Sequence, residues 1–148
     1  SSFLVKRKEY VDKSFNCPRC KKPGPYLQIY RLVRIPSIII VTSTIYQQKK
    51  VTPFSVVVRL PAKRDANTPE DMNPFLRFEA VAQVQHAGGM GGGHYWAVAR
   101  RAPIESGGKG GWWNLNDSSA SQTDGVLAPD SNTYCVFYHF VRVELVPK

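Results

Sequence analysis

The sequence predicts an α+β fold that is predominantly antiparallel β-sheet, in one domain over residues 1–148. Runs of Ile, Val, Thr, Tyr and Phe recur at strand length, and such residues suit a pleated, half-buried surface. Segments rich in Gly, Pro, Asn and Ser separate these runs, as loops do. Helical character is confined to short pieces, around residues 69–72. A chain of 148 residues suffices for one hydrophobic core but is short for two.

The expected strands follow these runs along the chain. Residues 38–41, Ile-Ile-Ile-Val, form a continuous apolar stretch that is typical of a strand covered on both faces. A further strand is expected to end near Asn116. The other expected strands are 27–30, 35–45, 54–60, 78–85, 95–100, 134–140 and 141–145. Loops are expected at 61–74, 87–93, 103–111 and 118–132.

The net charge of +9 is distributed unevenly along the chain. Residues 1–64 hold 14 Lys and Arg against 2 acids, whereas residues 65–148 hold 6 against 9. One interpretation of the basic half is a solvated face. The other is a surface that contacts an acidic partner or phosphates, including those of RNA.

The cysteine count and the hydropathy bear on the compartment. Three cysteines are too few for a disulfide scaffold, so we expect a reducing, intracellular compartment, cytoplasmic or nuclear. No run of about 18 or more uncharged apolar residues occurs, which predicts no membrane span. The chain begins with Ser1 rather than Met, as expected of a processed product or an excised segment.

The first chemical motif is Cys17-Pro18-Arg19-Cys20. This Cys-x-x-Cys spacing places two thiolates on one side of a tight turn, as tetrahedral zinc requires. A structural zinc site needs four ligands, and the sequence offers no second pair. The motif therefore predicts an incomplete zinc site, with an unmetallated knuckle as the alternative. No cofactor is required by any other motif.

The second motif is a glycine-rich loop that leads from His86 to His94 between two expected strands. Nucleotide-binding loops precede a helix, and because a strand follows here, we exclude that class. A histidine at the start of a strand suits a general base when another group orients its ring. Asn116 and Asp117 end the next strand, and adjacent residues point to opposite faces, so one of them faces His94. The alternative is a structural histidine beside an ordinary Asn-Asp-Ser-Ser turn.

Several segments occur in a fixed order along residues 10–140. These are the Cys-x-x-Cys knuckle, Leu32-Val33-Arg34-Ile35-Pro36 before the apolar run, residues 78–86, Gly92-Gly93-His94-Tyr95-Trp96, and residues 112–118 and 133–138. In this order they resemble the ubiquitin-specific proteases, which are papain-like cysteine hydrolases. The resemblance implies the palm and part of the fingers of that fold. Residues 1–64 would be the fingers-like part, and residues 65–148 would carry the histidine box.

The resemblance also implies roles for single residues. His94 takes the position of the catalytic general base, Asn116 that of the residue that orients it, and Asp117 that of the acidic residue that follows. The residues that match the ubiquitin-tail loop are His86, Gly92, Gly93 and Tyr95. Those that match the second half of the zinc ribbon are Cys17 and Cys20.

The family's nucleophile box, Gly-Asn-Thr-Cys, has no counterpart before Cys17, and Cys135 falls in a core strand. Two functions follow as alternatives. The chain either supplies the base and the orienting residue to a thiol-dependent deubiquitinase that is active only with a missing N-terminal part, or it is an inactive pseudo-deubiquitinase. In the second case it would act as a basic scaffold, for example in a ribonucleoprotein assembly. The expected partners are ubiquitin, a ubiquitin-like protein or a scaffold that covers the cleft, with RNA for the basic half.

Overall fold

The computed structural model describes residues 3–10, 16–23, 26–32, 34–43, 51, 54–89, 91–102, 110–125 and 130–148. The chain forms two compact units that interleave along the sequence. Unit 1 consists of Ser1–Ile35, Arg59–Leu76 and Val143–Lys148, and unit 2 of Pro36–Val58 and Arg77–Arg142. The expectation of a single domain with a change of character at residue 64 stays a prediction.

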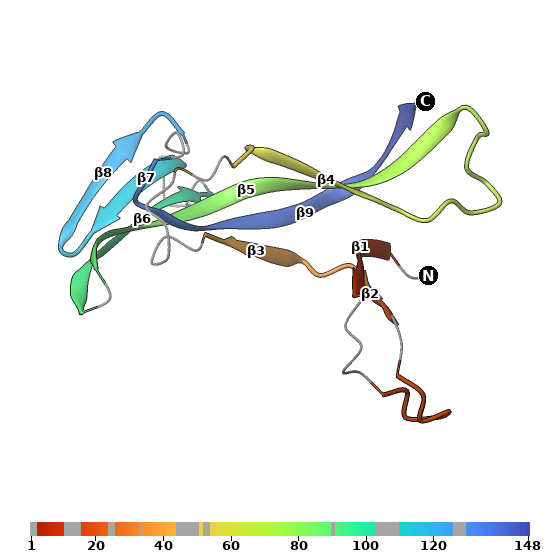
Figure 1. The fold of residues 1–148 in the computed structure, drawn as a ribbon. Coiled ribbons are helices and arrows are strands. Elements are labelled where there is room, and N and C mark those ends of the chain that lie inside the picture. Colours follow the sequence, from red (N-terminus) through yellow and green to blue (C-terminus); the bar gives the residue numbers. More distant parts are fainter. Residues whose placement is uncertain are drawn as a thin grey trace. The chain divides into compact units, whose positions relative to one another are not determined.

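Strands dominate the described residues, and none of these residues is helical (Figure 1). This confirms the predominantly antiparallel β fold. The strands are β1 (Phe3–Tyr10), β2 (Tyr26–Leu32), β3 (Ile38–Thr42), β4 (Val57–Pro61), β5 (Met72–Gly89), β6 (Gly92–Arg101), β7 (Gly111–Asn116), β8 (Ser119–Thr123) and β9 (Thr133–Pro147). In the described segments, no helix is present that could cross a membrane.

One sheet contains seven of these strands, in the order β3-β9-β5-β6-β7-β8, with β4 paired to β5 outside that path. The pairs β3–β9, β5–β6, β6–β7 and β7–β8 are all antiparallel. The core of unit 2 is made by side chains of β5, β6 and β9, among them Phe78, Val98 and Tyr138. The Tyr138 hydroxyl donates a hydrogen bond of 2.9 Å to the Ser55 carbonyl, so its buried polar end is satisfied.

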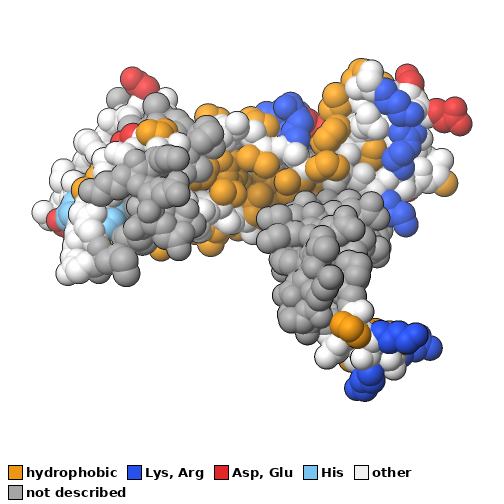
Figure 2. All heavy atoms as spheres, in the orientation of Figure 1, with side chains coloured by type: hydrophobic (Ala, Val, Ile, Leu, Met, Phe, Trp, Pro, Cys, Tyr) orange, Lys and Arg blue, Asp and Glu red, His pale blue; other side chains and the backbone are white. Residues whose placement is uncertain are grey.

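Strand β3 departs from the expectation that its apolar run is covered on both faces. It lies at the edge of the sheet and pairs with β9, and Ile38 and Ile40 are 42% and 56% exposed. Figure 2 shows hydrophobic side chains gathered over the sheet. An apolar sequence makes burial of a strand favourable, but the strand is buried only where other elements cover its faces. Residues 44–45 of the expected strand lie outside the described residues.

Other expectations about single elements were wrong in whole or in part. Residues 119–123 form β8 rather than a loop, because the polar sequence Ser-Ala-Ser-Gln-Thr pairs with β7 through its backbone. Residues 69–72 form a turn rather than a helical piece, with the Met72 amide bonded to the Pro69 carbonyl at 3.1 Å. The expected loops 61–74 and 87–93 are also shortened, since β5 begins at Met72 and continues to Gly89. Strand β1 was not expected, because its sequence is largely charged.

Candidate functional site

The candidate site is built on β5, β6 and β7 in unit 2. A hairpin joins β5 to β6, and its register pairs Ala87 with His94 and Gly89 with Gly92. Strand β7 pairs with β6 on the other side, with Ala97 opposite Leu115. Because β6 begins where β7 ends, the start of β6 and the end of β7 lie at the same end of the sheet. This arrangement brings His94 near Asn116, although 22 residues separate them.

His94 and Asn116 form a direct hydrogen bond, with His94 Nε2 2.5 Å from Asn116 Oδ1. An amide oxygen only accepts hydrogen bonds, so Nε2 carries the hydrogen. In the neutral ring this tautomer leaves a lone pair on Nδ1, the nitrogen that can accept a proton. The His94 side chain is 47% exposed, so a reacting group can reach it. The geometry matches the expected base and orienting residue, and their catalytic roles stay predictions.

Asp117 lies in the two-residue turn that joins β7 to β8. Its φ of 51° is in the left-handed region, which Asp adopts more readily than most residues. Its Oδ2 is 3.9 Å from His94 Nε2, and the side chain is 79% exposed. This distance exceeds a hydrogen bond, so Asn116 rather than Asp117 directly contacts the imidazole.

The side chain of His86 packs against the glycine-rich hairpin. His86 is only 4% exposed, and its ring packs on Tyr95 with centroids 4.3 Å apart. A Cβ on Gly93 would collide with His86 Nε2 and would lie 2.5 Å from the Ala87 carbonyl oxygen. Gly93 therefore has no room for a side chain. The structure leaves Gly92, Gly93 and Tyr95 exposed, and the predicted contact of the four residues with a ubiquitin tail stays a prediction.

A turn at the start of β9 is hydrogen-bonded to β5 in the same region. In Asp130-Ser131-Asn132-Thr133, the Asp130 carboxylate accepts hydrogen bonds from the Asn132 amide at 2.9 Å and the Thr133 hydroxyl at 3.2 Å. The Asn132 carbonyl accepts from the His86 amide at 2.7 Å, and Thr133 Oγ1 accepts from Gln83 Nε2 at 3.0 Å. The expected loop 118–132 includes the first three residues of this turn. The same Asp-x-Asn-Thr pattern occurs at 65–68.

Sequence reasoning also missed Trp96. Its ring stacks on His94, with centroids 5.9 Å apart and an angle of 20° between the planes. The two residues are separated by one position on β6, and alternate residues of a strand point to the same face. That spacing was the available signal.

Cys17 and Cys20 lie together in a turn of unit 1, as their spacing predicted. The Lys21 amide bonds the Cys17 carbonyl at 2.8 Å, and Lys21 has a φ of 58°. Backbone N–H groups of Cys20 and then Arg19, followed by the Cys20 thiol, lower the pKa of Cys17 below its usual range by hydrogen bonding. Among the described residues, no cluster of three or more His, Cys, Asp or Glu could hold a metal. Two thiols fit half of a tetrahedral zinc site, and the expected zinc stays a prediction.

Cys135 lies in β9, where it pairs with Thr42 and is 6% exposed. Burial raises the pKa of its thiol. A buried thiol with a raised pKa is a poor nucleophile, because the thiolate is the reactive form. The expectation of a core cysteine agrees with this placement.

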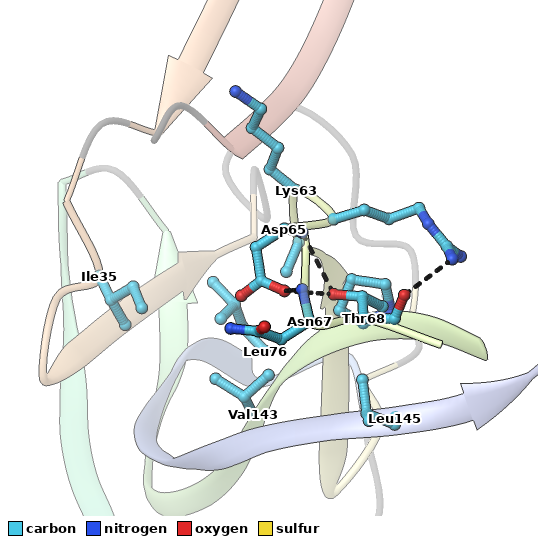
Figure 3. A pocket seen from close by; sticks show the side chains of 11 residues that line it. Ile35, Lys63, Asp65, Asn67, Thr68, Leu76, Val143 and Leu145 are labelled. Atoms are coloured by element: carbon cyan, nitrogen blue, oxygen red, sulfur yellow. Dashed lines mark hydrogen bonds between the residues drawn. The ribbon is translucent and has the colours of Figure 1, made fainter. Parts of the chain in front are cut away.

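A cavity of about 610 Å³ opens in unit 1 (Figure 3). Leu76, Val143 and Leu145 supply apolar walls, and the 65–68 turn supplies a polar one. That turn is internally bonded, with Asp65 Oδ1 2.8 Å from Thr68 Oγ1 and 3.0 Å from the Asn67 amide. No residue that the sequence singled out for chemistry lines this cavity.

Comparisons with known proteins bear on this arrangement. The sequence model of the family described as "Ubiquitin carboxyl-terminal hydrolase" matches residues 8–138. Ubiquitin carboxyl-terminal hydrolase 9 of Arabidopsis thaliana is 27% identical over 150 residues, which is 97% of this chain and 16% of the relative. Ubiquitin carboxyl-terminal hydrolase 15 of Homo sapiens is 27% identical over 92% of this chain and 14% of the relative. The chain thus spans a small part of these relatives.

Solved structures share the fold. The SAGA DUB module of Ubp8, Sgf11, Sus1 and Sgf73 bound to monoubiquitin gives a TM-score of 0.63 at 21% identity, over 94% of this chain and 31% of the matched chain. The Ubp8 module bound to ubiquitin aldehyde gives 0.60 at 20% identity, over 94% and 32%. Together with the family match, this confirms the resemblance and shows a partial ubiquitin-specific protease fold. The chain belongs to the ubiquitin carboxyl-terminal hydrolase family.

Proposed function

We propose that this chain supplies the general base and its orienting amide to a thiol-dependent deubiquitinase, and that the nucleophilic cysteine comes from outside these 148 residues. The hydrogen bond of 2.5 Å between His94 Nε2 and Asn116 Oδ1 carries the proposal. It fixes the tautomer that leaves Nδ1 as the proton acceptor. The family membership supplies the reaction class.

In the proposed reaction, His94 Nδ1 takes the proton of the thiol, and the thiolate attacks the carbonyl carbon at the C-terminal glycine of ubiquitin. As the tetrahedral intermediate collapses, Nδ1 gives this proton to the leaving amine. The same base then activates the water that hydrolyses the thioester. Asn116 keeps its hydrogen bond to Nε2–H in both charge states of the ring. Asp117 adds a weak attraction for the imidazolium, because water screens its exposed carboxylate.

The positions of the three cysteines support an external nucleophile. Cys135 is buried in β9, whereas Cys17 and Cys20 occupy the knuckle. We propose that the knuckle is half of a zinc ribbon whose other ligands lie outside the described residues. Zinc would be structural there, and the hydrolysis itself requires no cofactor.

The same cysteine positions favour a second candidate, an inactive pseudo-deubiquitinase that binds ubiquitin, a ubiquitin-like protein or a scaffold subunit. The Ubp8 structures contain ubiquitin or its aldehyde together with Sgf11, Sus1 and Sgf73. Under either candidate, we expect the exposed apolar strand β3 to be covered by further chain or by a partner. None of the relatives named above is described as binding RNA.

A ubiquitin-based probe with a C-terminal electrophile separates the two candidates. We expect it to label a longer protein that contains this chain, and not the 148-residue chain alone. His94→Ala should slow labelling about 10²- to 10⁴-fold, the range of general-base contributions. The matched control is His139→Ala, an exposed histidine on β9. Equal labelling of the His94 and His139 variants would refute the assignment, and ubiquitin binding without any labelling would favour the pseudoenzyme.

A further inference from the structure

Trp96 occupies a central position beside the His94–Asn116 pair. The rings of His94 and Trp96 are stacked and nearly parallel, with centroids 5.9 Å apart. The β6–β7 register pairs Ala97 with Leu115, and its continuation by one residue places Trp96 opposite Asn116. Trp96 is therefore next to His94 on the same face of β6, and it lies opposite Asn116 on the neighbouring strand β7.

This position matters because the His94 side chain is 47% exposed. Water competes for both partners of an exposed hydrogen bond, and an exposed imidazole can rotate out of line. A stacked indole restricts that rotation and excludes water from one side of the ring. Its electron-rich face also attracts the imidazolium that forms when the base holds a proton.

We propose that Trp96 is a positioning residue for His94, whose indole holds the imidazole so that Nε2–H points at Asn116 Oδ1 and Nδ1 stays available to a thiol. Its catalytic consequence rests on the proposed function. The effect on the ring does not, because this chain alone contains all three side chains.

Trp112 provides a matched control. It is also a half-buried tryptophan on the sheet, and it lies on the same face as Asn116, two alternations earlier on β7. Its partner on β6 is Arg100, which is remote from His94 along that strand. Loss of Trp112 removes a similar aromatic surface without removing the stack on His94.

The tautomer of His94 can be read from its ring ¹⁵N chemical shifts, recorded on histidine-labelled chain at about pH 8.5. His86→Gln and His139→Gln variants assign the three histidines. We expect the Nε2–H form to dominate in the wild type and in Trp112→Leu. Trp96→Leu should lower the ratio of Nε2–H to Nδ1–H about three- to tenfold, and Trp96→Phe should restore most of it. Backbone amide spectra verify that each variant is folded.

An unchanged tautomer ratio in folded Trp96→Leu would overturn the proposal, as would an equal loss in Trp112→Leu. In a longer protein that reacts with the ubiquitin probe, Trp96→Leu should lower kcat about three- to tenfold at unchanged KM, with rescue by Trp96→Phe. A kcat unchanged by Trp96→Leu would also count against it. If the tautomer responds and no form of the longer protein hydrolyses ubiquitin conjugates, the proposed function fails and the positioning role of Trp96 stands.

Discussion

Gly93→Ala should destabilise the fold, and the structure indicates by how much. The added Cβ would meet His86 Nε2, and would lie 2.5 Å from the Ala87 carbonyl oxygen and 2.9 Å from His86 Cε1. The ring cannot easily move away, because His86 is buried and its ring packs on Tyr95 with centroids 4.3 Å apart. Overpacking in a tight site costs about 1–3 kcal/mol. Because one of the obstacles is a backbone atom, we expect this variant to lose about 3 kcal/mol, the upper end of that range.

Urea unfolding followed by tryptophan fluorescence measures this loss. The matched control is Gly89→Ala in the same hairpin, because a Cβ there meets nothing within 4 Å. Its free energy of unfolding should change by less than about 0.5 kcal/mol. Because Gly93 precedes His94, Gly93→Ala should also slow labelling by the ubiquitin probe in a longer protein. Equal stabilities of the two alanine variants would refute the packing argument.

Three further outcomes are expected. Asn116→Ala should slow probe labelling about 10- to 100-fold, less than loss of the base itself, because the ring keeps Nδ1 but loses its acceptor; an unchanged rate would show that the pair is not catalytic. Iodoacetamide should alkylate Cys17, whose pKa is lowered by hydrogen bonds, well before Cys135, whose pKa is raised by burial, as mass spectrometry of digests would show; faster reaction of the buried thiol would contradict this. Hydrogen bonds, first of all from the Thr68 hydroxyl, lower the pKa of Asp65. The stabilisation from this carboxylate is therefore present above the unfolded-state pKa of about 3.9 and is lost as the pH falls through the lower folded-state pKa. The stability difference between wild type and Asp65→Ala should shrink in acid, and a difference that grows would contradict this reasoning.

The contact between His94 and Asn116 was predictable from the sequence. The order of the motifs places both residues at strand ends, and the alternation of side chains along a strand limits which residue faces the histidine. Only one of two adjacent residues could face the histidine, and the register selects Asn116. The stack of Trp96 on His94 follows from the same alternation, but its strength depends on ring orientation, which no sequence pattern reports.

Other features depended on tertiary context. Thr123 is the single β-branched residue of strand β8. This strand forms because its backbone pairs with β7 in a hairpin. The apolar run of β3 predicted burial, yet the residues that would cover an edge strand need not be near it in sequence. The sequence predicts only a loop at Asp130, because the hydrogen bonds between this turn and β5 join residues far apart in the chain.

The antiparallel pairing of β6 with β7 has a practical consequence for labelling the protein. His94 and Asn116 lie at one end of this strand pair, whereas Arg101 pairs with Gly111 at the other. The Arg101–Gly111 end of the pair is therefore remote from the hydrogen bond between His94 and Asn116. An affinity tag or a fluorescent domain inserted after Arg101 would leave unchanged the register that aligns the imidazole with its amide. That end of the strand pair is thus the preferred place to attach a reporter.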